Sequence, residues 1–142
     1  MFTRQLACLA FSSLLVAPVA LAQTPVALEL GKSVSAELAG GQTHQYTVTA
    51  EEGQFFRVNV LRPDIPTAVR LLDPNDQSKL VDMHWSSTSL LDTLCWIAAT
   101  TGEYRLELAA ESKTGATKYQ IKLAELRSAL PDDGKRIEAQ NL

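Results

Sequence analysis

The sequence predicts an all-β protein, an antiparallel β-sandwich of jelly-roll type with about eight or nine strands. Three observations support this fold class. Short runs of alternating apolar and polar residues recur about every ten residues, glycine, proline and Asx turn signals separate them, and few stretches are long enough for a helix. The crossover helices of a parallel α/β fold therefore have no place in this chain.

The N-terminus has the three-part layout of a secretory signal peptide. Arg4 precedes a nearly continuous apolar run from Leu6 to Leu21, and Ala20-Leu21-Ala22 offers a cleavage site with small residues. A retained membrane span is the alternative, but Pro18 interrupts the run, which is shorter than the roughly 20 residues that a span needs. We therefore expect residues 1–22 to be removed, leaving a periplasmic or secreted chain without membrane contact.

The charge and cysteine content exclude several classes of protein. Removing Arg4 with the signal peptide leaves 12 basic and 16 acidic residues, a net charge of −4, which argues against a nucleic-acid partner. Cys8 lies inside the apolar run and not after it, so we expect no lipid anchor. Cys95 is then the remaining thiol, and between Leu94 and Trp96 it is expected to be a buried structural residue.

Residues 23–127 are predicted to form the sandwich domain. Gly40-Gly41 and Gly53 end two of its strands, and Asp73-Pro74-Asn75-Asp76 is typical of a type I turn. Pro63 and Pro66 lack the amide hydrogen that a sheet ladder needs, so this segment is predicted to cross between two sheets. The predicted strands cover residues 26–30, 34–38, 44–50, 54–61, 67–72, 79–83, 94–99, 103–108 and 118–126.

The segment Leu94–Leu108 is predicted to be a β-hairpin on which the other strands assemble. It contains a strand, a turn through Thr101-Gly102, and a second strand. In the second strand Tyr104, Leu106 and Leu108 share one face. One side of this hairpin is expected to face the core and the other to face water.

Residues 128–142 are predicted to be a linker and a short helical tail. Pro131 precedes Asp132-Asp133, which places negative charge where a helix begins, and Lys135–Leu142 has helix-forming composition. A helix of at most three turns needs packing to be stable.

A series of short landmarks occurs in order along the predicted strands and turns. They are Leu30-Gly31, Val34–Leu38, Gly41-Gln42 with His44–Tyr46, Gly53, Leu71–Pro74 and Thr101–Leu106. The order of these landmarks, over about residues 26–126, resembles the bacterial pre-peptidase C-terminal domain. The resemblance implies a jelly-roll-like sandwich that secreted proteins carry as a non-catalytic appendage, sometimes aiding secretion or substrate attachment.

The tail continues the series with Glu125–Arg127, Pro131–Asp133 and Arg136–Gln140. These residues resemble the junction at which such a sandwich precedes tetratricopeptide repeats in exported proteins. The resemblance implies that helical repeats follow, although no repeat period is present within the 142 residues.

No catalytic residues are predicted. His44 lies on an alternating strand and His84 in a loop, neither within a nucleophile or zinc motif. We therefore expect a protein that is not an enzyme.

Two candidate binding sites follow from the sequence. Some relatives of this sandwich bind calcium, and the hard oxygen ligands that would serve here are Asp73, Asn75, Asp76 and Asp82. The same Asp73 segment is already explained as a turn, so no cofactor is required. Trp85, beside His84 in a polar loop, is the candidate for a carbohydrate contact, whereas Trp96 is assigned to the core.

Two functional hypotheses remain open. The first is a non-catalytic exported interaction or accessory module that leads a longer repeat protein. The second is a stand-alone periplasmic or secreted module that binds a glycan, a peptide or calcium. Both allow a protein or carbohydrate partner.

Overall fold

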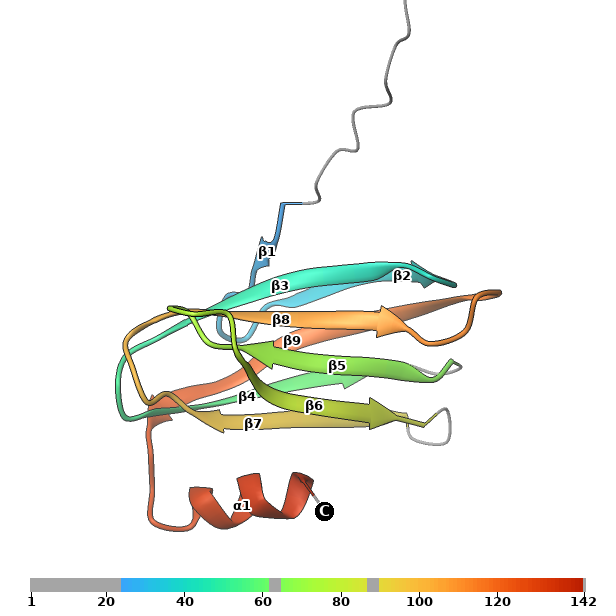
Figure 1. Ribbon diagram of the computed structural model, residues 1–142. Helices are drawn as coiled ribbons and strands as arrows, with labels where there is room; N and C mark the ends of the chain where they lie inside the picture. Colours follow the sequence, from blue (N-terminus) through green and yellow to red (C-terminus); the bar gives the residue numbers. More distant parts are fainter. Residues whose placement is uncertain (1–23, 62–64, 87–89, 142) are drawn as a thin grey trace, which may run out of the picture.

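The computed structural model describes residues 24–61, 65–86 and 90–141, so the predicted signal peptide lies outside the described residues. Two β-sheets pack face to face, and one short helix lies beneath them in Figure 1. The elements are β1 (Val26–Ala27), β2 (Ser33–Ala39), β3 (Thr43–Ala50), β4 (Gln54–Leu61), β5 (Thr67–Leu72), β6 (Lys79–Trp85), β7 (Leu91–Ile97), β8 (Gly102–Ala110), β9 (Ala116–Ser128) and α1 (Asp133–Gln140). The predicted β-sandwich is confirmed.

The strands are shared between a five-stranded sheet A, in the order β1-β3-β8-β5-β6, and a four-stranded sheet B, in the order β2-β9-β4-β7. The β5–β6 pair is an antiparallel hairpin, whereas the other described connections between successive strands pass from one sheet to the other. The predicted crossing is confirmed, because β4 belongs to sheet B and β5 to sheet A. β8 lies at the centre of sheet A, and β9 lies between β2 and β4 in sheet B.

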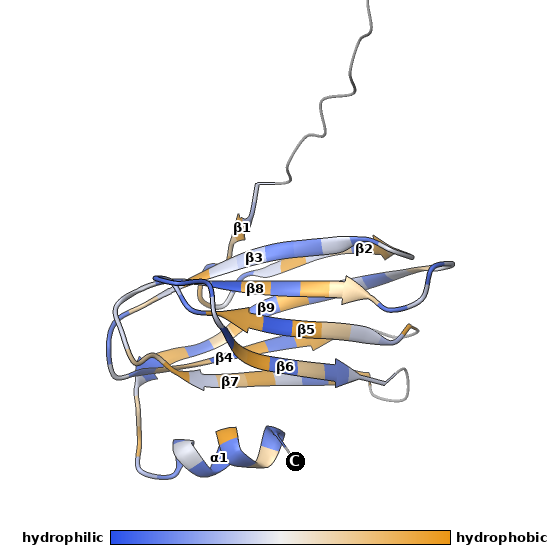
Figure 2. Cartoon of the chain, viewed as in Figure 1, coloured by the Kyte–Doolittle hydropathy of each residue, from blue (hydrophilic) through white to orange (hydrophobic). Residues whose placement is uncertain are grey.

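The core lies between the sheets and follows the alternation of the strands. Figure 2 shows apolar and polar residues succeeding one another along them. Phe56, Val58 and Val60 point inward as predicted and are fully buried. Phe55 is equally buried although it lies on the opposite face, because the Arg127 guanidinium covers its ring at 4.6 Å from the centroid.

The predicted hairpin at Leu94–Leu108 is wrong. β7 pairs with β4 in sheet B, whereas β8 pairs with β3 and β5 in sheet A, so the connection crosses the sandwich. The Tyr104 hydroxyl holds this crossing by donating to the Thr100 carbonyl at 2.7 Å. Burial alternation is the same for two strands in one sheet and for two strands facing each other, so it did not reveal this topology.

Helix α1 begins at Asp133, within the predicted start, and runs along β7 in Figure 1. Half of its eight residues are exposed, and Asp133 is the buried one. The helix is therefore held by a few contacts, which the next subsection describes.

Candidate functional site

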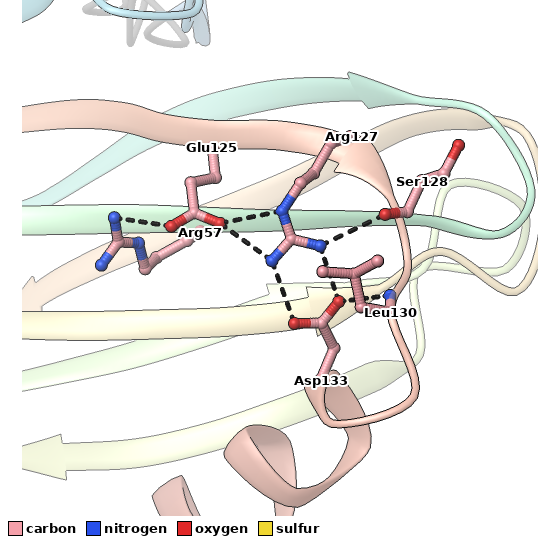
Figure 3. A network of polar contacts seen from close by, with 6 residues as sticks. All are labelled: Arg57, Glu125, Arg127, Ser128, Leu130 and Asp133. Atoms are coloured by element: carbon pink, nitrogen blue, oxygen red, sulfur yellow. Dashed lines mark hydrogen bonds and ion pairs between the residues drawn. The ribbon is translucent and has the colours of Figure 1, made fainter.

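A polar network lies on the outer face of sheet B, where the chain leaves β9 for α1 (Figure 3). Glu125 lies between Arg57, whose guanidinium is 2.8 Å away, and Arg127 at 3.1 Å. Arg127 binds both carboxylate oxygens of Asp133, at 2.7 and 3.0 Å. Asp133 also accepts the backbone N–H of Leu130 at 2.6 Å. This network fastens the linker and the start of α1 to the sheet.

The Asp133 carboxylate is the most perturbed member of this network. Its side chain is 2% exposed, and the hydrogen bonds from Arg127 and from the Leu130 N–H lower its pKa from 3.8 to about 2. The folded state therefore favours ionised Asp133. This contribution to stability is present above pH 3.8 and is lost as the pH falls toward 2.

We expect Asp133→Asn to weaken the docking of α1 at neutral pH and to flatten the loss of stability between pH 3.8 and 2. The neutral amide keeps the shape but loses the charge-assisted bonds to Arg127. Thermal midpoints measured across this pH range test the expectation. The control is Asp132→Asn, because Asp132 is exposed and pairs with Lys135. Identical acid profiles for wild type and Asp133→Asn would contradict this role.

A separate part of the outer face of sheet B forms a groove among the described residues. Cross-strand partners of an antiparallel pair lie on the same face, so the pairs Ser35–Gln120, Gln120–Leu61 and Leu61–Leu91 form one row across all four strands. The next row contains Ser33, Lys122, Asn59 and Thr93. The groove has a volume of about 460 Å³ and is lined by Ser35, Ala36, Glu37, Leu61, Lys118, Tyr119 and Gln120.

Behind the groove, three polar side chains join the two sheets. The Tyr119 hydroxyl of β9 is hydrogen bonded to the Tyr46 hydroxyl of β3 and lies 2.7 Å from His44 Nδ1. Burial raises the pKa of Tyr119 and of Tyr46 and lowers that of His44, so all three are neutral at pH 7. The cluster satisfies its own polar atoms and fixes the position of β9 under the groove.

The sequence-predicted residues His84 and Trp85 lie on β6 and not in a loop. Trp85 belongs to the core and is 8% exposed, so its predicted exposure is wrong. The indole packs inward because residue 85 continues the alternation of β6, which the sequence interpretation ended at Met83. His84 is exposed and pairs with Glu111. Both residues line a hollow of about 480 Å³ between β6 and β7, next to Gln140.

The four calcium candidates are not gathered into one group. Asp73 accepts the N–H of Asn75 at 2.8 Å, and Asp76 accepts that of Ser78 at 2.9 Å, as in a turn that stabilises itself. Asp82 pairs with Lys79 and Arg70. Over the described residues, no three His, Cys, Asp or Glu side chains come close enough to hold a metal ion.

The groups most suited to catalysis have structural partners. His44 is bonded to Tyr119 and His84 to Glu111. Cys95 is buried, and burial raises the pKa of its thiol, which disfavours the reactive thiolate. Trp96 packs against the core, as predicted.

The groove was missed by sequence reasoning. The alternation of residues 118–126 does place Lys118 and Gln120 on the outside. Their meeting with Ser35 and Leu61 depends on the order of strands in sheet B, for which the sequence carries no local signal.

Comparison with known proteins identifies the fold. No protein-family model matches the chain, and no curated protein matches its sequence. Among solved structures, the pre-peptidase C-terminal domain of a collagenase from Bacillus anthracis is similar, with a TM-score of 0.57, 17% identity, and coverage of 71% of this chain and 95% of that one. PliG from Aeromonas hydrophila, a periplasmic inhibitor of g-type lysozyme, is also similar, with a TM-score of 0.56, 14% identity, and coverage of 69% and 92%.

These similarities show that the chain shares its β-sandwich fold with the family that its sequence resembles. At these sequence identities, the binding residues of the similar proteins cannot be assigned to positions of this chain. The helix in the described part of the chain is too short and too polar to cross a membrane.

Proposed function

We propose that this chain is an exported, non-catalytic accessory module that binds a partner protein through the sheet-B groove. The observation that carries the proposal is Leu61, a large apolar residue that is 49% exposed at the end of β4, an inner strand of sheet B. Ser35, Glu37, Lys118 and Gln120 line the same groove with hydroxyl, amide and charged side chains. An apolar centre with a polar rim is the usual anatomy of a protein interface.

A protein fits this surface better than a glycan. Neither row of outward residues contains an aromatic ring on which a sugar could stack, and the Tyr119 hydroxyl is already engaged with His44 and Tyr46. Glu37 and Lys118 are cross-strand partners and offer both signs of charge to a partner. PliG, which shares the fold, is an inhibitor of a protein, and this supports the choice.

Export and the wider architecture are part of the same proposal. Cleavage after Ala22 would release the chain into the periplasm or the medium. The tail residues that resemble the junction with tetratricopeptide repeats support a place at the head of a longer repeat protein. The second candidate, a stand-alone glycan- or peptide-binding module, is favoured by the hollow that His84 and Trp85 line.

A photo-crosslinking amino acid in place of Gln120, in the producing cells, is expected to yield a covalent adduct with a protein. The matched control carries the crosslinker in place of Glu103, an exposed residue of sheet A. Leu61→Asp should reduce the adduct at least about tenfold, because it buries a charge in the centre of the interface.

The outcome is read by mass spectrometry of the purified adducts. Equal labelling from positions 120 and 103, or labelling that Leu61→Asp leaves unchanged, would contradict the groove. An adduct with a glycan and none with a protein would favour the second candidate.

A further inference from the structure

Strand β7 is an edge strand of sheet B, and β4 is its neighbour within the sheet. Edge strands present unpaired N–H and C=O groups, and proteins usually protect them with charges or prolines. β7 carries Asp92 as its charged residue, and residues 93–101 contain neither a charge nor a proline. By contrast, β6, the edge of sheet A on the same side, carries Lys79, Asp82 and His84. β7 thus has the sequence of a strand that pairs readily.

A side chain of α1 occupies this edge at Cys95. The Cys95 N–H donates to Oε1 of Gln140 at 2.7 Å, and Nε2 of Gln140 donates to the Cys95 carbonyl at 2.7 Å. A carboxamide has the same donor and acceptor as a peptide group. Gln140 therefore reproduces the two hydrogen bonds that an antiparallel neighbouring strand would make at this position.

The helix that carries Gln140 is attached mainly at its two ends. Asp133 binds Arg127 at the start, and Gln140 binds Cys95 at the end. Between them Ile137 is half-buried, whereas Lys135 and Arg136 are exposed. Eight residues of this composition are too few for a stable isolated helix, so losing either end releases the cover.

We propose that α1 is an autoinhibitory cover of the β7 edge, and that the uncovered edge pairs antiparallel with β7 of a second copy of this chain. A two-fold axis at Cys95 lets each copy give the other the N–H and C=O bonds that Gln140 now makes. In that register Asp92 of one copy faces Ala98 of the other, so no like charges meet. The exposed Leu91 adds apolar surface near the new interface.

Gln140→Ala in the full chain tests the cover. We expect the Cys95 amide to exchange with solvent roughly tenfold faster, because its acceptor is gone, and the protein to dimerise with increasing concentration. Glu138→Ala is the matched control, since Glu138 is exposed on the same helix and should leave exchange and mass unchanged. Unchanged Cys95 exchange, or a Gln140→Ala variant that stays monomeric in sedimentation at all concentrations, would overturn the proposal.

A second substitution identifies the surface. Thr93→Lys places a charge on the edge strand and should return Gln140→Ala to a monomer. Dimers that persist in the double variant form through another surface and would overturn the pairing. A Gln140→Ala variant that binds added strand-forming peptides of other sequence, but never itself, would show that the occupant is not a second copy.

Discussion

Phe56→Ala is expected to lower the free energy of unfolding by about 3–5 kcal/mol. Phe56 is fully buried, and its ring lies 5.6 Å from that of Tyr104, so the pair joins sheet B to sheet A. Truncation removes this contact and leaves a cavity between the layers. Since a domain of this size is stable by only about 5–15 kcal/mol, urea unfolding should show a marked fall in the midpoint.

Leu61→Ala is the matched truncation on the same strand. Leu61 is 49% exposed, so its truncation should lower the free energy of unfolding by less than about 1 kcal/mol. The truncation should nevertheless lower the affinity for any partner that binds at the groove. Similar losses of stability at positions 56 and 61 would contradict the division of β4 into a core face and an open face.

Tyr119→Phe is expected to cost about 1–3 kcal/mol of stability, because it leaves the buried Tyr46 hydroxyl without a partner. The same substitution also removes the hydrogen bond between the Tyr119 hydroxyl and His44 Nδ1. Tyr46→Phe removes one bond of the same cluster and leaves the Tyr119–His44 contact, so it should cost less. Urea unfolding measures the loss of stability in each variant. A larger loss for Tyr46→Phe than for Tyr119→Phe would contradict the central position of Tyr119 in the cluster.

The same cluster predicts a pH dependence. Burial lowers the pKa of His44 below 6.5, so the folded state favours the neutral ring. Its contribution to stability is present above pH 6.5 and is lost as the pH falls below that value. Nδ1 of the neutral ring can accept the Tyr119 proton, whereas a protonated ring can only donate at Nδ1. Tyr119 then has to accept from His44 and to donate its own proton to Tyr46. His44→Gln should remove this part of the pH profile, whereas His84→Gln should retain it.

The sequence predicted the strands and their faces well, because burial alternates along each strand whatever its neighbours are. Phe56, Val58 and Val60 were assigned to the core on this basis. Pairing is a different kind of information. The hairpin expected at Leu94–Leu108 failed because each strand there finds its partners in a different sheet.

The candidate site was less accessible to prediction than the fold. The groove requires Ser35 and Leu61 to meet Gln120, and these residues come from three strands far apart in the chain. The burial of Phe55 beneath Arg127 could not be predicted, because the alternation of residues 54–61 places Phe55 on the solvent-facing side. Trp85 was misplaced because a polar stretch around it concealed the end of a strand.

The order of strands also governs when the protein can fold. β8 and β9 occupy inner positions of the two sheets, yet they are made after the other described strands, and Ser33 finds its partner only at Lys122. Neither layer can close before residues 102–128 have emerged from the ribosome. Such distant pairings also make folding slow, typically in milliseconds to seconds. The sandwich therefore stays incomplete until nearly all of its own residues have been made, which would suit the export proposed above.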